Sequence, residues 1–271
     1  MIHTIPEELL SRKVKVALIG AGGTGSRVLE QLLCLHRAIV ARGHPHGLSV
    51  TVFDDDEVSE ANIGRQAFYP SDIGLKKARV LVNRVNMALG GSAIWEARCE
   101  RVQQTTSLCD FHLVIGCVDN RAARKSIFRA ICSGLWSRSV YWLDFGNRAN
   151  DGQAILGEVR PKGKRFTEPA LPHVGELFPD LLDPSKEEGD DTPSCSLAEA
   201  LDKQSLYVNQ AVSVQGMNII WNLMSKGSID VHGVFINLDD SMVMPLRVDP
   251  EQWARFNAGP LAKKKRVRNP S

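Results

Sequence analysis

The sequence contains no pair of cysteines spaced as Cys-x-x-Cys, which argues against structural zinc sites of that type. Its six cysteines are scattered along 271 residues, and most of them lie in apolar, periodic segments. Scattered cysteines of this kind are typical of buried, reduced thiols, so we expect a cytoplasmic protein. The six are Cys34, Cys99, Cys109, Cys117, Cys132 and Cys195.

Long apolar runs and a strong excess of one charge are also absent. No apolar run approaches the ~18 residues that a membrane helix needs, and none follows a basic N-terminal segment. We therefore expect neither a membrane span nor a secretory signal. A net charge of +2 argues against general nucleic-acid binding. The tail over 261–271 resembles a basic nuclear-import or nucleic-acid patch, although most such tails are simply solvated.

Predicted strands and helices alternate along the first half of the chain. We expect strands over 14–19, 48–53, 92–98, 112–117 and 139–145, with helices over 26–36, 78–89 and 121–132. This alternation predicts an α/β fold, a Rossmann-like and mostly parallel sheet with helices on both faces. Ligands of such sheets bind beyond the carboxyl ends of the strands.

The pattern changes in the second half, which we interpret as an extension of the same domain. Residues 1–150 form the predicted nucleotide-binding region, 151–260 the extension and 261–271 the basic tail. The extension begins with a strand over 153–159 that predicts antiparallel pairing. A mobile loop over 160–195, rich in proline and charge, then leads to a long helix over 197–224. A hairpin of strands 231–237 and 242–248 follows.

A glycine turn joins the first predicted strand to the first long helix. Its sequence is Gly20-Ala21-Gly22-Gly23-Thr24-Gly25. Glycines let the chain turn tightly and bring backbone N–H groups close to a phosphate, and a helix N-terminus favours an anion. Asp54, which follows the second strand, can accept hydrogen bonds from a ribose. The alternative is a turn used only for close packing of the helix on the strand.

Further motifs accompany the glycine turn in a fixed order. They are Asp54, Asn62-x-x-Arg65-Gln66, Gly74-x-x-Lys77 and Cys117-x-Asp119-Asn120. Together they resemble the E1-like adenylyltransferases, the ThiF/MoeB family that activates ubiquitin-like proteins. Within that family, the chain most resembles the ThiF-family member of the bacterial PRTRC gene system. The resemblance covers 14–145 well and continues less securely through the helix over 197–224.

The resemblance implies an ATP- and Mg²⁺-dependent reaction. A carboxylate, typically the C-terminal glycine of a small ubiquitin-like or sulfur-carrier protein, attacks the α-phosphate of ATP, and pyrophosphate leaves. Arg65 and Lys77 would offset the charge on the phosphates, and Asp119 would hold Mg²⁺. The implied nucleotide-binding residues are Gly20, Gly22, Gly23, Gly25, Asp54, Asp56, Asn62, Arg65, Gln66, Lys77, Asp119 and Asn120.

Several of these assignments leave alternatives open. Arg65 could be only the partner of a surface ion pair, and Lys76 competes with Lys77 for the same task. Either Asp119 or Asn120 could cap the following helix. Cys195 lies where family members carry a cysteine that forms a thioester or persulfide, but it could instead be a partly buried structural thiol.

The resemblance also suggests a homodimer, with two departures. Many relatives lend an arginine from an N-terminal helix to the partner's site, and Arg12 lies too close to the first strand to match. The Cys-x-x-Cys pairs of several relatives are missing. The helix over 197–224 is a candidate dimer face through Val208, Ala211, Val212, Val214, Gln215 and Ile219. Alternative functions are a tRNA threonylcarbamoyladenosine dehydratase, an NAD-dependent oxidoreductase and a partner that binds ATP without turnover.

Overall fold

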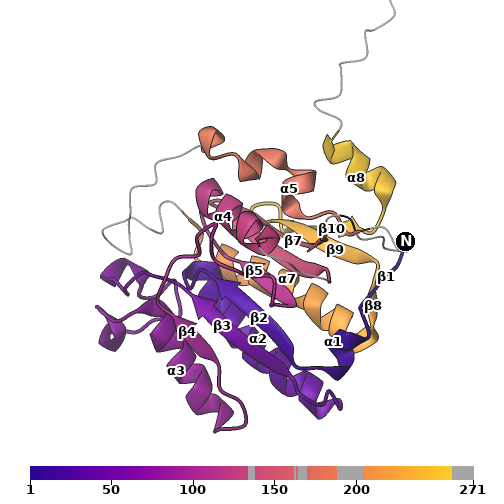
Figure 1. The fold of residues 1–271 in the computed structure, drawn as a ribbon. Coiled ribbons are helices and arrows are strands. Elements are labelled where there is room, and N and C mark those ends of the chain that lie inside the picture. Colours follow the sequence, from indigo (N-terminus) through magenta and orange to yellow (C-terminus); the bar gives the residue numbers. More distant parts are fainter. Residues whose placement is uncertain (134–137, 162, 164–169, 188–203, 258–271) are drawn as a thin grey trace, which may run out of the picture.

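A computed structural model describes residues 1–133, 138–161, 163, 170–187 and 204–257 of the chain (Figure 1). Its centre is an eight-stranded sheet with the strand order β10-β9-β7-β6-β5-β2-β3-β4. The strands are β2 (Val14–Ile19), β3 (Leu48–Phe53), β4 (Glu96–Arg98), β5 (Leu113–Gly116), β6 (Val140–Asn147), β7 (Asp151–Val159), β9 (Val231–Asn237) and β10 (Met242–Arg247). A second, two-stranded sheet pairs β1 (His3–Thr4) with β8 (Ser228–Ile229).

The large sheet changes from parallel to antiparallel at β7. Strands β4, β3, β2, β5 and β6 are all parallel to one another. β7 is antiparallel to β6, and β9 and β10 continue the antiparallel part. The predicted fold class, a mostly parallel Rossmann-like sheet extended by antiparallel strands, is therefore confirmed. One sheet joins residues from both halves of the sequence.

Helices cover both faces of this sheet. One face packs against α2 (Gly23–Ala41), α3 (Lys77–Leu89) and α7 (Val208–Lys226), whose apolar residues form the larger core. The other face packs against α4 (Arg121–Cys132) and α5 (Val174–Leu177) in a second core. Alternate residues of β2 enter the two cores: Val16 and Leu18 enter the first, and Ala17 and Ile19 the second. This alternation follows from the two-residue period of a strand.

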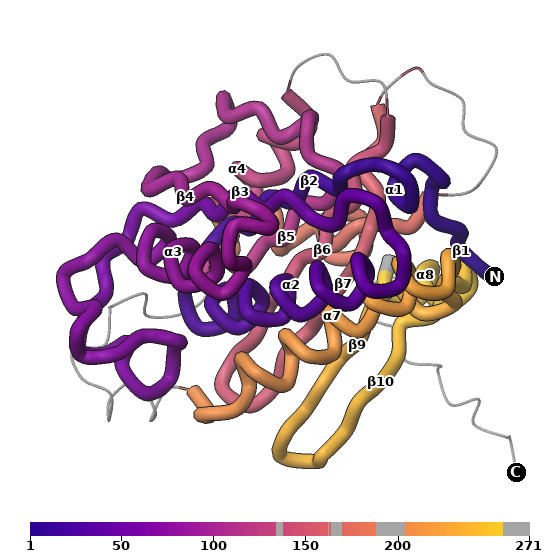
Figure 2. Tube along the Cα trace, turned by 90° about the horizontal axis from the view of Figure 1, so that it is seen from below, coloured from indigo at the N-terminus to yellow at the C-terminus, as the bar shows by residue number. Residues whose placement is uncertain are grey.

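Helix α7 lies beside α2, as the view from below shows (Figure 2). Gly216 allows α7 to approach the sheet, because an added Cβ there would lie 2.3 Å from the Phe145 ring. Val208, Val212 and Ile219 are buried within the chain. Their prediction as part of a dimer face is therefore wrong; of that predicted set, Val214 is exposed. The predicted start of this helix at 197 lies outside the described residues.

Other differences from the predictions have local causes. Helix α2 runs to Ala41 rather than 36, because its apolar stripe continues through the buried Ile39. Strand β4 spans only Glu96–Arg98, whereas the sequence predicted a strand over 92–98. The predicted loop 160–195 contains α5, η3 (Pro179–Leu182) and η4 (Pro184–Lys186), held by the burial of residues such as Leu177. The remaining short elements are α1 (Glu8–Ser11), η1 (Glu60–Asn62), η2 (Pro70–Asp72) and α8 (Pro250–Asn257).

Within the described ranges, none of the helices has the length and apolar character required to cross a membrane.

Candidate functional site

The candidate site lies where the carboxyl ends of β2, β3 and β5 meet. β2 pairs with β3 on one side and with β5 on the other, so the chain leaves this point in opposite directions. Such a topological switch point is where open α/β sheets bind their ligands. The glycine turn follows β2, Asp54 follows β3, and Asp119 comes shortly after β5. The structure thus brings the predicted motifs to one edge of the sheet.

The glycines of the turn have different surroundings. Gly20 has a φ of +90°, and a Cβ there would lie 2.7 Å from the carbonyl oxygen of Cys117. A Cβ on Gly25 would lie 1.8 Å from the Gly20 oxygen, so both glycines are needed for close packing. A Cβ on Gly22, by contrast, would have no atom within 4 Å. The turn therefore serves packing and also leaves one glycine facing open space, where a ligand could approach the backbone.

The first turn of α2 begins at this open glycine. Gly22 is the N-cap residue, and no side chain of the described residues caps the first N–H groups of the helix. These groups carry the positive end of the helix dipole. The start of α2 can therefore accept an anion without first displacing a capping side chain.

Asp54 is tied to the glycine turn rather than extended into solvent. Its Oδ2 accepts a hydrogen bond from the Ala21 N–H at 2.6 Å, and its Oδ1 accepts one from the Asp56 N–H at 3.0 Å. Burial raises the pKa of the Asp54 carboxyl, while the hydrogen bond from Ala21 and the charge of Lys77 oppose that rise. Asp54 thus links β3 to the turn that would hold a phosphate.

The two neighbouring lysines are distinguished by their partners. Lys77 is buried, and its Nζ lies 3.0 Å from Asp56 Oδ2. Lys76 instead forms an ion pair with Glu57 at 3.2 Å, and the Lys76 side chain is more exposed than that of Lys77. Lys77 is therefore the lysine whose charge reaches Asp54. Asp56, predicted to bind the nucleotide, is the ion-pair partner of Lys77 in this structure.

Arg65 has only neutral hydrogen-bond partners in the described part of the chain. Its Nη1 donates to Gln204 Oε1 at 3.4 Å, and its Nε donates to the Ala61 carbonyl at 3.4 Å. Burial lowers the pKa of Arg65, and the nearby charge of Asp119 opposes this. No described carboxylate forms an ion pair with Arg65, so the surface ion-pair interpretation has no support there.

Asn62 and Gln66 lie close to Arg65 in the sequence but differ in what they offer a ligand. Asn62 Oδ1 accepts the Ser59 N–H at 2.9 Å and closes the short helix η1, so this oxygen already has a structural partner. Gln66 Oε1 is buried and has no hydrogen-bond partner among the residues that the structure describes. A buried unpaired oxygen costs free energy until a donor reaches it. The Ala67 N–H donates to Ser26 Oγ at 3.2 Å, which fixes this segment against the start of α2.

Asn120, not Asp119, caps helix α4. Asn120 Oδ1 accepts the Ala123 N–H at 2.8 Å, and its Nδ2 donates to Asp119 Oδ1 at 3.1 Å. Asp119 is exposed and keeps a carboxylate oxygen available. One carboxylate together with phosphate and water oxygens is a ligand set that Mg²⁺ accepts. The described residues contain no cluster of three or more His, Cys, Asp or Glu that could hold a metal without such help. Cys195, the predicted nucleophile, lies outside the described residues.

Two features of the site escaped the sequence interpretation. Arg124 and Asp144 form a buried ion pair, with Nε 2.9 Å from Oδ1, and Arg124 Nη2 also donates to the carbonyls of Val118 and Phe145. The pair thereby holds the chain just before Asp119. An aspartate inside an apolar predicted strand was a signal for it. The second feature is the contact of Asn209 with Thr24, which no local pattern indicated.

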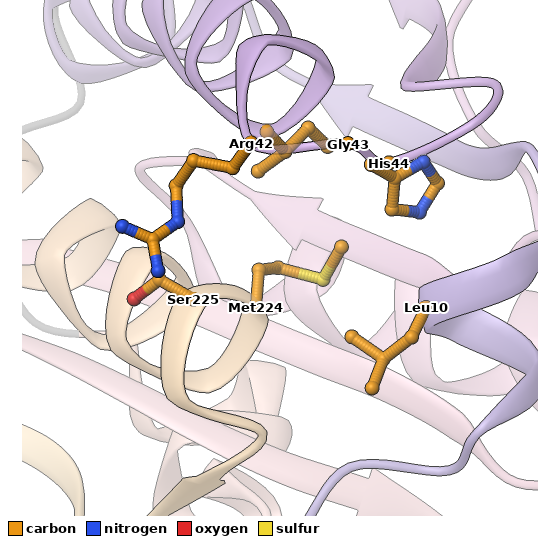
Figure 3. A pocket seen from close by; sticks show the side chains of 7 residues that line it. Leu10, Arg42, Gly43, His44, Met224 and Ser225 are labelled. Carbon is orange, nitrogen blue, oxygen red and sulfur yellow. The ribbon is translucent and has the colours of Figure 1, made fainter.

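The structure also has a pocket of about 230 Å³, and Figure 3 shows the side chains that line it. It lies at the C-terminal ends of α2 and α7 and is lined by Leu10, Ile39, Arg42, Gly43, His44, Met224 and Ser225. His44 is held structurally, since its Nε2 lies 2.9 Å from the Leu9 carbonyl oxygen. None of the predicted site residues lines this pocket.

Two curated proteins resemble part of the chain. The chain is 28% identical over 120 residues to the ATP-dependent ubiquitin transferase-like protein Cap2 of Enterobacter hormaechei subsp. hoffmannii (strain UCI 50), covering 43% of this chain and 18% of that protein. It is 28% identical over 138 residues to the adenylyltransferase and sulfurtransferase UBA4 of Yarrowia lipolytica (strain CLIB 122 / E 150), covering 48% and 31%. The matched segments thus span less than a third of these relatives.

The crystal structure of PaaA has the same fold. It matches with a TM-score of 0.56 at 16% identity, covering 87% of this chain and 64% of that one. A model of the ThiF family matches residues 6–244, which is most of the chain. The fold, the glycine turn at the switch point and this match lead to one conclusion: the chain belongs to the ThiF family of E1-like proteins.

Proposed function

We propose that this protein is an ATP-dependent adenylyltransferase that activates the C-terminal carboxylate of a small ubiquitin-like or sulfur-carrier protein ending in glycine. The observation that carries the proposal is the placement of Arg65. Its partly buried guanidinium has no described carboxylate partner, and it lies at the same sheet edge as Lys77 and Asp119. Two cations and an exposed carboxylate around an open glycine turn suit a triphosphate with its metal better than a nicotinamide cofactor.

Each residue has a role that its contacts allow. The open Gly22 and the uncapped start of α2 would bind phosphate oxygens, and Asp54 would accept a ribose hydroxyl. Lys77 would exchange its contact with Asp56 for a phosphate oxygen, and Arg65 would offset the charge that builds on the phosphates. Gln66 Oε1 is buried and has no partner in the described part of the chain, so a donor group of the ligand would satisfy it. Asp119 would hold Mg²⁺, which lowers the charge of the triphosphate.

The reaction itself needs alignment more than covalent help. The carboxylate oxygen of the substrate forms a bond to the α-phosphorus of ATP, and the bond to pyrophosphate breaks. The products are an acyl-adenylate and pyrophosphate. Holding the two reactants in line and neutralising the developing charge supplies most of the rate in such transfers. In a second step, the Cys195 thiolate would take the acyl group and release AMP.

Isotope exchange between pyrophosphate and ATP tests the first step. Wild-type protein, Mg-ATP and a glycine-terminated ubiquitin-like protein encoded beside this chain should give exchange that depends on the carboxylate. Asp119→Ala should lose the exchange while remaining folded, and Asp240→Ala, an exposed acid in the β9–β10 turn, should keep it. Absence of exchange from folded wild-type protein with such partners would falsify the proposal.

Two further measurements separate the finer proposals. Cys195→Ser should keep the exchange but lose a thiol-sensitive adduct with the substrate; an unchanged adduct would remove Cys195 from the second step. We also propose a homodimer, a cytoplasmic location and a place in the PRTRC gene system, in keeping with the sequence resemblance. A stabilisation of the fold by NAD and not by ATP would instead favour the oxidoreductase alternative.

A further inference from the structure

A chain of polar side chains connects the first turn of α2 to Arg65. Thr24 Oγ1 donates to Asn209 Oδ1 at 2.8 Å, and Asn209 Nδ2 donates to Gln204 Oε1 at 2.9 Å. The same Gln204 oxygen accepts the Arg65 Nη1–H at 3.4 Å. Four residues from three distant parts of the sequence therefore form one continuous path. It joins the proposed phosphate-binding turn to the proposed phosphate-binding arginine.

The middle of this path is buried and closely fitted. Asn209 is 5% exposed, and its side chain occupies the space beside Gly23, where an added Cβ would lie 2.7 Å from Asn209 Nδ2. Asn147 Nδ2 also donates to Asn209 Oδ1, at 3.4 Å. A buried amide whose oxygen and nitrogen are both paired holds a defined orientation, because any other orientation leaves polar atoms unsatisfied.

Gln204 is fixed from the other side by the backbone of a turn. Its Nε2 donates to the Arg148 carbonyl at 3.3 Å, and the Ser205 N–H donates to the Ala149 carbonyl at 2.8 Å. With its nitrogen held there, the Gln204 amide must turn its oxygen toward Asn209 and Arg65. A neutral oxygen orients the guanidinium without neutralising it, whereas a carboxylate at the same place would compete with a phosphate for the charge.

We propose that Gln204, held by Asn209, is a positioning residue that orients Arg65 for the phosphates of the nucleotide. The proposal rests on the proposed function and adds a residue beyond its motifs. If Gln204 acts through Arg65, its loss should matter only while Arg65 is present. A purely structural role would weaken nucleotide binding to the same extent with or without Arg65.

A double-mutant cycle on Mg-ATP binding tests this, with dissociation constants measured by isothermal titration calorimetry. Gln204→Ala should raise the dissociation constant about fivefold, within the range expected for the loss of one ordinary hydrogen bond, since this one is long at 3.4 Å. In an Arg65→Ala background, the same change should raise it less than about twofold. Gln204→Glu should raise it at least about tenfold, because the new carboxylate pairs with Arg65, and added salt should reduce that effect.

Gln104 provides a matched control. It also accepts a hydrogen bond from an arginine, Arg129, but near the far end of α4. Gln104→Ala should leave the dissociation constant for ATP unchanged. Urea unfolding of every variant shows whether its free energy of unfolding differs from that of the wild type. Equal effects of Gln204→Ala with and without Arg65, or tight ATP binding by Gln204→Glu, overturn the inference. Failure of wild-type protein to bind ATP overturns the proposed function and this inference with it.

Discussion

Replacing Asp144 by alanine should destabilise the protein severely and leave a defect beside the candidate site. The Asp144 side chain is fully buried on β6, and the Arg124 side chain, on α4, is 5% exposed. Both carboxylate oxygens accept from Arg124 Nε, at 2.9 and 3.0 Å. Burial raises the pKa of Asp144 and the charge of Arg124 opposes this, so the two groups depend on each other.

The magnitude follows from the charge that is left behind. Asp144→Ala removes the only described carboxylate that pairs with Arg124 and leaves a guanidinium in the core. Breaking a buried pair in this way costs about 3–5 kcal/mol of the free energy of unfolding. A natural domain has only about 5–15 kcal/mol in total. The variant should therefore unfold at much lower urea concentration than the wild type.

A matched control and a compensating variant sharpen the test. Arg247 and Asp230 form an exposed pair at 3.2 Å, and Asp230→Ala should cost less than about 1 kcal/mol. The double variant Asp144→Leu/Arg124→Met removes both charges and should recover part of the lost stability. Its affinity for ATP should nevertheless remain below that of the wild type, because the methionine at position 124 cannot donate to the Val118 carbonyl ahead of Asp119. An Asp144→Ala protein within about 1 kcal/mol of wild type would refute this reasoning.

Three further predictions concern pH, the glycine turn and the lysines. Burial lowers the pKa of His232 to about 4, and its Nε2 accepts a hydrogen bond from Trp253 Nε1 that protonation would abolish. Stability from the neutral His232 ring is complete well above pH 6.5 and declines as the pH falls toward 4. Because His112 also has a pKa lowered to about 4, the test is a difference: between pH 7 and pH 5, urea unfolding should show that the wild type loses about 2 kcal/mol more than His232→Gln. Gly25→Ala should disrupt the glycine turn, because its Cβ would clash with the Gly20 oxygen. Gly22→Ala adds a Cβ in open space, so this variant should keep the wild-type melting temperature but lose affinity for ATP. A Gly25→Ala protein that is stable and binds ATP would contradict the packing argument. Lys77→Met should weaken ATP binding roughly tenfold or more, and Lys76→Met should not, as calorimetry can check; equal effects would mean that the two lysines share the role.

The sequence by itself determined the class of fold and the edge on which the site lies. Short, nearly continuous apolar runs and helical stripes with period 3.6 alternate from Val14 to Phe145, and this pattern admits few arrangements other than a parallel sheet covered on both faces. Short signals also limited the cap of α4 to Asp119 or Asn120, and the structure shows that it is Asn120. These features depend on residues that are close together in the sequence, so the sequence alone is enough to predict them.

Only the tertiary structure decided which side chains meet across the sequence. The contacts of Arg124 with Asp144, Asn209 with Thr24, and Gln204 with Arg65 join residues 20 to 185 positions apart. The burial of Val208 and Val212 against the sheet, which contradicts their assignment to a dimer face, likewise depends on how closely α7 packs. No local pattern encodes such distances, because long-range packing orients a buried polar group toward whichever partner the fold brings near. The sequence thus identified the proposed nucleotide-binding residues, and the fold revealed the polar contacts that hold them in place.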